Sequence, residues 1–280
     1  MITSHKHFSL EGKTTFELVK GHPPFRTPAV MDDEACFYYI IKGKSRVFSP
    51  YGRIESLASN GLALQCGNYI AEFAQNQDTS FEAMAVHLHK DHLRSIFQEE
   101  LSTLLEDADS SKAISHRSYS SSRLLSAYID SLAFYFKNPH LVSDELQRLK
   151  IKELLLLLAK SDRIEEVKKL VNGLFTTEHP RLVQIVERHL TSRVNLEELA
   201  FLCQMSLSTF KRAFKRHYGE APASYLRRKR LEMASELLKT SDQSIAEVAE
   251  ECGFADPAHF TKSFAKAFGQ TPSEFRAVKI

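Results

Sequence analysis

The sequence predicts an α+β protein, with a β-barrel and some helices first and an all-α domain of two helix-turn-helix units, joined by a long helix, after it. Two observations support this. One residue pattern occurs twice in the last hundred residues, each time with the spacing of helix, tight turn and helix. The first ninety residues instead hold short apolar runs separated by Gly, Asn and Pro turns, as in antiparallel sheets. We expect the domains to span 1–175 and 176–280.

The early strands are expected at residues 37–41, 45–48, 53–58, 62–66 and 83–88. Lys42-Gly43 closes the first of them, and the second is its expected hairpin partner. Ser49 to Gly52 is the next predicted turn. His87 and His89 alternate on the last strand, so two imidazoles would share one face, as in a metal site. A polar strand end is the alternative we favour, and we assign no catalytic residue, metal or cofactor.

Helical periodicity begins at about Asp91 and predicts helices at about 93–105, 124–136 and 144–160. The helix at 144–160 is apolar on more than one side around Leu154–Leu158. Either it is simply buried, or it also pairs with a second copy in a homodimer.

The repeat becomes clear when the two copies are aligned. Leu199, Ala200 and Cys203 match Val248, Ala249 and Cys252 at an offset of 49 residues. From there on the offset is 50, and the matched residues are Phe210, Phe214, Tyr218, Gly219, Pro222 and Tyr225 with Phe260, Phe264, Phe268, Gly269, Pro272 and Phe275. A one-residue insertion in the turn accounts for the change, so the sequence indicates a duplicated unit.

Each copy begins with a capping-box pattern, Asn195-x-x-Glu198 in the first and Ser244-x-x-Glu247 in the second. These patterns place the two helix-turn-helix units at about 195–218 and 244–268. In the first copy we expect the opening helix to run through Gln204 and Ser206 to cap the next helix. In the second copy Gly253 is expected to supply the turn, Asp256 to cap, and Pro257 to take the first helical position.

The second helix of such a unit is the one that lies in the DNA major groove. An advance of about 100° per residue places Ser208, Lys211, Arg212 and Lys215 opposite the Phe210/Phe214 stripe. The outward residues of the second copy are Ala258, Thr261, Lys262 and Ala265. A solvated charged face is the alternative, but two copies in register favour DNA. Because the second face has fewer long donors, methyl contacts and DNA shape should matter more there.

A single helix from Ala223 to Lys239 is expected to join the copies. At about 1.5 Å per residue it would be roughly 25 Å long, which suits recognition helices set about one DNA turn apart. The run 227–230, Arg-Arg-Lys-Arg, lies on this helix. It either contacts phosphates or forms salt bridges with Glu232 and Glu236.

The last hundred residues resemble the DNA-binding domain of the AraC/XylS family of bacterial transcription regulators. The matching motifs lie at residues 206–215, 230–231, 244–254 and 269–276. The resemblance assigns base-facing roles to Ser208, Thr209, Lys211, Arg212, Pro257, Ala258, Thr261 and Lys262. It also implies a preceding cupin-like sensor domain, activation of transcription, double-stranded DNA as partner, and control by a small-molecule effector or a regulatory protein. A cupin-type metal enzyme, or an adaptor that sequesters proteins, is the alternative.

Bulk composition fits a soluble globular protein, with 43% apolar and 26% charged residues and a net charge of +2. Residues 181–280 hold 16 Lys and Arg against 12 Asp and Glu, so this part is mildly basic. The four cysteines lack metal-type spacing. Neither a signal peptide nor an apolar run of membrane-spanning length is visible, so we expect a cytoplasmic protein without membrane contact.

Overall fold

The computed structural model describes residues 1–73, 80–97, 116–119, 123–160, 170–171, 174 and 181–277. The chain forms two compact units. Unit 1 comprises Met1–Pro50 and Ile54–His179, and unit 2 comprises Tyr51–Arg53 and Pro180–Ile280. The domain boundary expected at residues 175 and 176 lies outside the described residues, as do residues 98–105 of the first expected helix.

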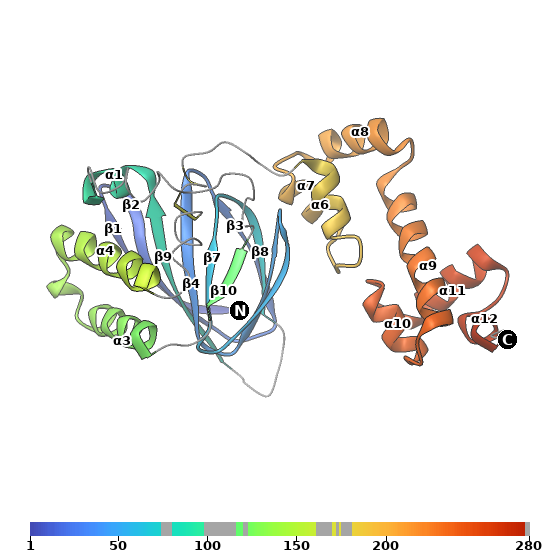
Figure 1. The fold of residues 1–280 in the computed structure, drawn as a ribbon, viewed down its shortest axis with the longest axis horizontal. Helices are drawn as coiled ribbons and strands as arrows, with labels where there is room; N and C mark the ends of the chain where they lie inside the picture. The colour runs from blue at the N-terminus through green and yellow to red at the C-terminus, as the bar shows by residue number, and fades with distance from the viewer. Residues whose placement is uncertain are drawn as a thin grey trace. The chain divides into compact units, whose positions relative to one another are not determined.

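Unit 1 is built on two sheets (Figure 1). The six-stranded sheet A has the order β1-β2-β9-β4-β7-β10, with every neighbouring pair antiparallel. Its strands are β1 (Ile2–Leu10), β2 (Lys13–Gly21), β9 (Phe81–His89), β4 (Glu34–Lys42), β7 (Gly61–Leu64) and β10 (His116–Tyr119). The four-stranded sheet B has the order β3-β8-β5-β6, and its strands are β3 (Phe25–Met31), β8 (Gly67–Phe73), β5 (Lys44–Ser49) and β6 (Gly52–Leu57).

One expected pairing is wrong. The strands β4 and β5 follow one another closely but lie in different sheets, where β4 pairs with β7 and β9 and β5 pairs with β8. Between them Gly43 has a φ of +92°, a value that favours glycine and lets the chain turn from one sheet to the other. The strands β1, β2, β3, β8 and β10 were not predicted from the sequence.

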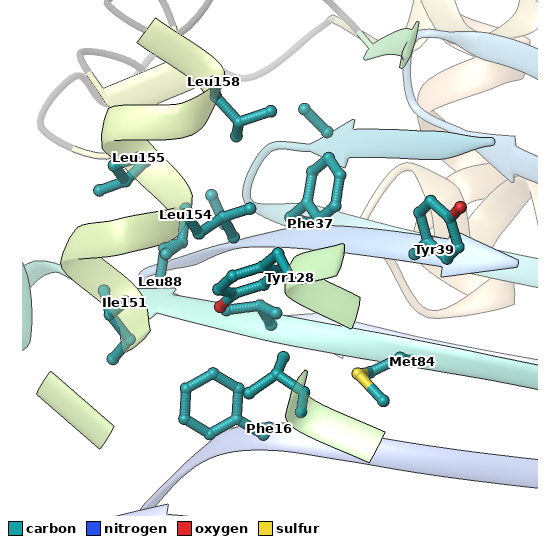
Figure 2. Packing of buried hydrophobic residues seen from close by; sticks show 14 of the residues in the cluster. Phe16, Phe37, Tyr39, Met84, Leu88, Tyr128, Ile151, Leu154, Leu155 and Leu158 are labelled. Carbon is teal, nitrogen blue, oxygen red and sulfur yellow. The ribbon is translucent and has the colours of Figure 1, made fainter. Parts of the chain in front are cut away.

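Helices cover one face of sheet A. They are α1 (Lys90–Phe97), α3 (Arg123–Lys137) and α4 (Asp144–Lys160), with a 3-10 turn at Pro139–Leu141. The expected helices at 124–136 and 144–160 are therefore confirmed. Their apolar sides pack on alternate residues of the strands. The buried cluster includes Phe16, Phe37, Tyr39, Met84 and Leu88 from the sheet and Tyr128, Ile151, Leu154, Leu155 and Leu158 from the helices (Figure 2). Because side chains alternate along a strand, the other face of sheet A is free to face sheet B.

In the described part of unit 2 outside Tyr51–Arg53, the regular elements are all helices, joined by turns and short loops. The helices are α6 (Leu182–Arg188), α7 (Leu196–Leu202), α8 (Leu207–Tyr218), α9 (Pro222–Thr240), α10 (Ile245–Glu251), α11 (Pro257–Phe268) and α12 (Pro272–Ala277). The expected joining helix is thus confirmed as α9, with α6–α8 near its start and α10–α12 near its end (Figure 1). No helix in the described part of the chain is long and apolar enough to cross a membrane.

Candidate nucleic-acid interface

The two helix-turn-helix units of unit 2 share one aromatic frame. The ring centroids of Phe210 and Phe214 are 5.6 Å apart at an interplanar angle of 57°. Those of Phe260 and Phe264 are also 5.6 Å apart, at 60°. Each frame continues to a ring at the end of its helix, 4.4 Å away in both copies. All four of these phenylalanines are fully buried. The duplication seen in the sequence is therefore a duplication of packing geometry.

Capping fixes where each helix of the frame begins. Glu198 donates its backbone N–H to the Asn195 side chain at 2.8 Å and accepts the Asn195 backbone N–H at 2.9 Å. The box formed by Ser244 and Glu247 has the same two bonds, at 3.2 and 2.7 Å. Both predicted capping boxes are confirmed, and both satisfy N–H groups that a helix start would leave unpaired.

The second helices, α8 and α11, are also capped as expected. Ser206 accepts the backbone N–H of Thr209 at 3.2 Å, and Asp256 accepts those of Ala258 and His259 at 2.9 and 3.2 Å. Left-handed glycines end both helices, Gly219 at φ +76° and Gly269 at φ +75°. The two recognition helices thus have the same length and the same boundaries relative to the buried frame.

The turn inside each unit uses a left-handed residue as well. In the second copy this residue is Gly253, at φ +79°, as expected. In the first copy α7 ends at Leu202, two residues earlier than predicted, and Gln204 takes the equivalent left-handed conformation at φ +55°. Both residues donate to a carbonyl three positions back at 2.9 Å. The fold keeps the turn although the first copy lacks the glycine.

The outward faces carry the residues that the sequence assigned to DNA. Ser208, Thr209, Lys211, Arg212 and Lys215 are all exposed on α8. The capping residue Ser206 also restrains two of these side chains, because its hydroxyl lies 3.1 Å from that of Ser208 and 2.9 Å from that of Thr209. No ion pair in the described part of the chain involves the three cations. They present unneutralised positive charge to the solvent.

On α11 the face is less charged. Pro257, Ala258 and Lys262 are exposed and Thr261 is half-buried. The Thr261 hydroxyl donates to the Pro257 carbonyl at 2.9 Å, which leaves its oxygen lone pairs as acceptors. Lys262 is the one cation among the four residues.

The basic run on α9 divides into different roles. Arg228 pairs with Glu220 and Glu232 at 2.6 and 2.7 Å, and Lys229 pairs with Glu232 at 2.9 Å. The expected salt bridge to Glu236 is absent from this run, since that carboxylate pairs with Lys239. Arg227 is exposed. A phosphate contact by the run would therefore fall to Arg227 most directly.

Arg230 has a role that sequence reasoning missed. Its guanidinium donates to the carbonyls of Leu190, Ser192 and Gly253 at 2.7, 2.9 and 3.2 Å. The first two carbonyls precede the first helix-turn-helix unit, and the third belongs to the turn of the second. A salt bridge of 2.9 Å between Arg193 and Glu250 joins the same two segments. Arg230 is thus a clamp between the units. The only hint of this role in the sequence is that Arg230 lies next to Leu231, which is on the apolar side of α9.

The histidines that suggested a metal lie on β9 in unit 1. His87 lies 3.2 Å from Glu34 and 3.4 Å from Glu17, and His89 lies 2.7 Å from the Thr14 carbonyl. Within the described ranges, no group of three or more His, Cys, Asp or Glu side chains is arranged to hold a metal ion. The histidines make ion pairs and hydrogen bonds with the neighbouring strands.

Unit 2 therefore has the construction of a DNA-binding protein of the double helix-turn-helix class. Comparison with known proteins agrees. A family model described as a helix-turn-helix domain matches residues 199–277, and one described as the ExsA N-terminal regulatory domain matches residues 35–170. Together the two matches span most of the chain. Both matched parts are similar to transcription regulators of the AraC/XylS family.

Several curated relatives are similar over part of their length. The HTH-type transcriptional regulator ExsA of Pseudomonas aeruginosa is 35% identical over 47% of this chain and 47% of its own. The virulence regulon transcriptional activator VirF of Yersinia enterocolitica is 35% identical over 48% and 50%. The HTH-type transcriptional activator RhaS of Escherichia fergusonii is 41% identical over 34% of each chain. The chain thus spans half or less of the length of these relatives.

Proposed function

We propose that this protein is a sequence-specific transcription regulator that binds double-stranded DNA through two helix-turn-helix units and activates transcription. The observation that carries the proposal is the pair of matched recognition helices, α8 and α11, each capped and fixed on the same aromatic frame. The names of VirF and RhaS describe those relatives as activators, which supports the direction of control.

The DNA-contacting residues follow from the outward faces. We assign base or phosphate contacts to Ser208, Thr209, Lys211, Arg212 and Lys215 in the first unit and to Pro257, Ala258, Thr261 and Lys262 in the second. Arg and Lys donate to guanine edges or to phosphates, whereas hydroxyls and methyl groups suit several bases. Residues 176–280 form the DNA-binding domain in this proposal.

Residues 1–175 act as the regulatory domain, controlled by a small-molecule effector or a regulatory protein. The match of residues 35–170 to a regulatory domain supports this assignment. We further propose that α4 pairs with α4 of a second copy. Ile151, Leu154, Leu155 and Leu158 bury one side of the helix, yet the neighbouring Leu149 and Leu156 are 64% and 49% exposed.

DNA binding is tested by titrating the full chain with DNA from upstream of its own operon and with random DNA, across a salt series. We expect tighter binding to the upstream DNA and an affinity that falls as salt rises. The double variant Lys211→Ala, Arg212→Ala should lose this preference, while Lys239→Ala, at an exposed position on α9, should keep it. Equal binding of both DNAs by the wild-type protein, at every salt concentration, would refute the proposal.

Pairing through α4 is tested by light scattering. Leu156→Glu places a charge in the proposed interface and should convert a dimer to a monomer. Leu57→Glu is a matched control, because Leu57 is equally exposed, at 49%, but lies on β6. A Leu156→Glu variant that remains a dimer would place the interface elsewhere.

A further inference from the structure

Unit 1 contains a cavity of about 520 Å³ on the face of sheet A opposite the helices. Its walls come from both sheets and are mostly apolar. Small side chains leave the space open, since Ala83 and Ala85 of β9 and Ala71 of β8 all line it. Phe25, Phe73 and Phe81 pack against one another at one part of the wall, with ring centroids 4.0 to 6.2 Å apart. Cavities of this size bury most of the surface of a small ligand.

The same cavity has a polar part made by three strands. Glu17 on β2, Glu34 on β4 and His87 on β9 all line it. His87 stands between the two carboxylates, 3.2 Å from Glu34 through Nδ1 and 3.4 Å from Glu17 through Nε2. The Nε2 atom is buried and makes no hydrogen bond of satisfactory geometry in the described part of the protein. The His87 and Glu34 side chains are only 13% and 12% exposed.

The charges in this cluster do not balance. Burial opposes the charged imidazolium of His87, but the nearby carboxylates of Glu17 and Glu34 outweigh burial and raise its pKa to about 9. Burial also opposes ionisation of Glu17, yet the nearby imidazoles of His87 and His5 leave its pKa below the usual value. The cluster thus holds two acidic side chains and one basic side chain, so its formal charge is −1.

The other polar groups nearby have partners of their own. Lys13 pairs with Asp91 at 2.9 Å and is 46% exposed. His5 is half-exposed and lies 3.0 Å from Glu17. His89 donates to the Thr14 carbonyl at 2.7 Å and lies 3.3 Å from Glu34. An excess of negative charge therefore remains beside an apolar space, where water screens it poorly.

We propose that this cavity binds an amphiphile with an apolar chain and a protonated amine head. The ammonium group would donate to Glu17 and Glu34, and the chain would lie against the alanines and phenylalanines. A carboxylate head would instead have to approach two partly buried carboxylates of the same charge. The proposal deepens the regulatory role given to residues 1–175 and rests on that proposed function for its biological meaning, although the binding itself does not depend on it.

The test is isothermal titration calorimetry on the full chain with three probes of equal chain length, each below its micellar concentration or solubility limit. These are dodecylamine, dodecanol and dodecanoate. We expect dodecylamine to bind at least about 10-fold more tightly than either of the others, because a hydrogen bond to a charged group typically contributes a factor of about 10 to 100. Equal or tighter binding of dodecanoate overturns the proposal, and so does the absence of binding by all three probes.

Amino-acid variants test whether the amine binds in this cavity. Glu17→Gln with Glu34→Gln should weaken dodecylamine binding about 10-fold or more and leave dodecanol binding unchanged. Glu82→Gln is the matched control, because Glu82 lies on β9 but pairs with Lys20 and does not line the cavity. Ala85→Leu should reduce the binding of dodecylamine and dodecanol alike by filling the cavity. A thermal melt of each variant establishes that it is folded. Unchanged amine binding in the double Gln variant, or in a folded Ala85→Leu variant, overturns the site.

A separate titration of DNA with and without dodecylamine tests the regulatory role. Failure of DNA binding with intact amine binding would remove the proposed function and leave the ligand class in place. Failure of amine binding with intact DNA binding would remove the proposed ligand class and leave the proposed function in place.

Discussion

The two helix-turn-helix units are built on one frame but present different surfaces. Equivalent ring pairs differ by only 3° in interplanar angle in the recognition helices, from 57° at Phe210 and Phe214 to 60° at Phe260 and Phe264. Their outward faces differ far more, since α8 exposes Lys211, Arg212 and Lys215 and α11 exposes one lysine on its assigned face. Packing is thus shared, while the chemistry of the outward face differs between the copies.

This difference shows which residues the fold constrains and which can change without affecting the fold. A buried ring must match its neighbours in volume and direction, so the frame is kept. An exposed residue meets only solvent until DNA arrives, so its chemistry can vary without loss of stability. The first copy is suited to charge and hydrogen-bond donors, and the second to methyl contacts and DNA shape.

The largest expected effect tests the shared frame. Phe210→Ala and Phe260→Ala should each lower the free energy of unfolding by about 3–5 kcal/mol, because each removes a fully buried ring and leaves a cavity. Urea denaturation followed by circular dichroism measures both. We expect the two losses to agree within about 1 kcal/mol, which is the usual context dependence of such values. A clear inequality would show that the copies contribute unequally to unit 2.

The clamp between the copies comes next. Arg230→Ala removes three hydrogen bonds from a charged donor and leaves the Leu190, Ser192 and Gly253 carbonyls without it. We expect a loss of about 2–4 kcal/mol in urea denaturation. DNA binding should also become more tolerant of changes in half-site spacing, because the clamp sets the distance between the units.

Arg227→Ala is the control for that experiment. Arg227 is an exposed arginine on the same helix. The free energy of unfolding of the Arg227→Ala variant should therefore equal that of the wild-type protein. If both variants unfold alike, the bonds of Arg230 do not hold the units together.

The recognition faces should differ in salt dependence. Arg212→Ala should reduce binding to the specific site by about 1–3 kcal/mol, and Lys262→Ala should have an effect at the lower end of that range. Together, removal of Lys211, Arg212 and Lys215 should reduce the salt slope by about 3 if each contacts a phosphate, against about 1 for Lys262. Fluorescence anisotropy at several salt concentrations gives both quantities. Equal slopes in the two sets would mean that the copies use charge alike.

Sequence reasoning found the repeated unit because local rules determine it. Caps such as Asn195 and Asp256 act within three residues, and the aromatic stripe follows the helical period. The pairing of β4 with β5 was predicted wrongly because strand pairing depends on distant partners. Here β4 pairs with β9, and the paired residues lie 40 to 55 positions apart in the chain. Neighbouring strands often form hairpins, but the chain changes sheets at Gly43.

The residues of the candidate sites also differ in whether local sequence rules could predict their roles. The outward positions of Ser208, Lys211, Arg212 and Lys215 on α8 could be assigned from the helical period alone. The role of Arg230 could not, because its three acceptors lie 23 to 40 residues away in the sequence. The cluster of Glu17, Glu34 and His87 likewise joins three strands that only the folded sheet brings together.

The smallest expected effect concerns the turns. Gln204 adopts a left-handed conformation that disfavours a side chain, so Gln204→Gly should relieve about 1–2 kcal/mol of strain. Glycine also gains entropy in the unfolded chain, which offsets about 0.5–1 kcal/mol of that gain. We expect a net stabilisation of about 0.5 kcal/mol, measured as a small rise in the urea midpoint.

The equivalent residue in the second copy should respond in the opposite sense. A Cβ atom on Gly253 would lie 2.5 Å from the Thr191 carbonyl oxygen, and its φ of +79° already disfavours a side chain. Gly253→Ala should therefore destabilise unit 2 by more than the Gln204→Gly variant stabilises it, because the carbonyl belongs to the backbone and the clamp holds that segment in place. If Gly253→Ala were neutral, the segment at Thr191 would have room to shift, and the two turns would be equivalent after all.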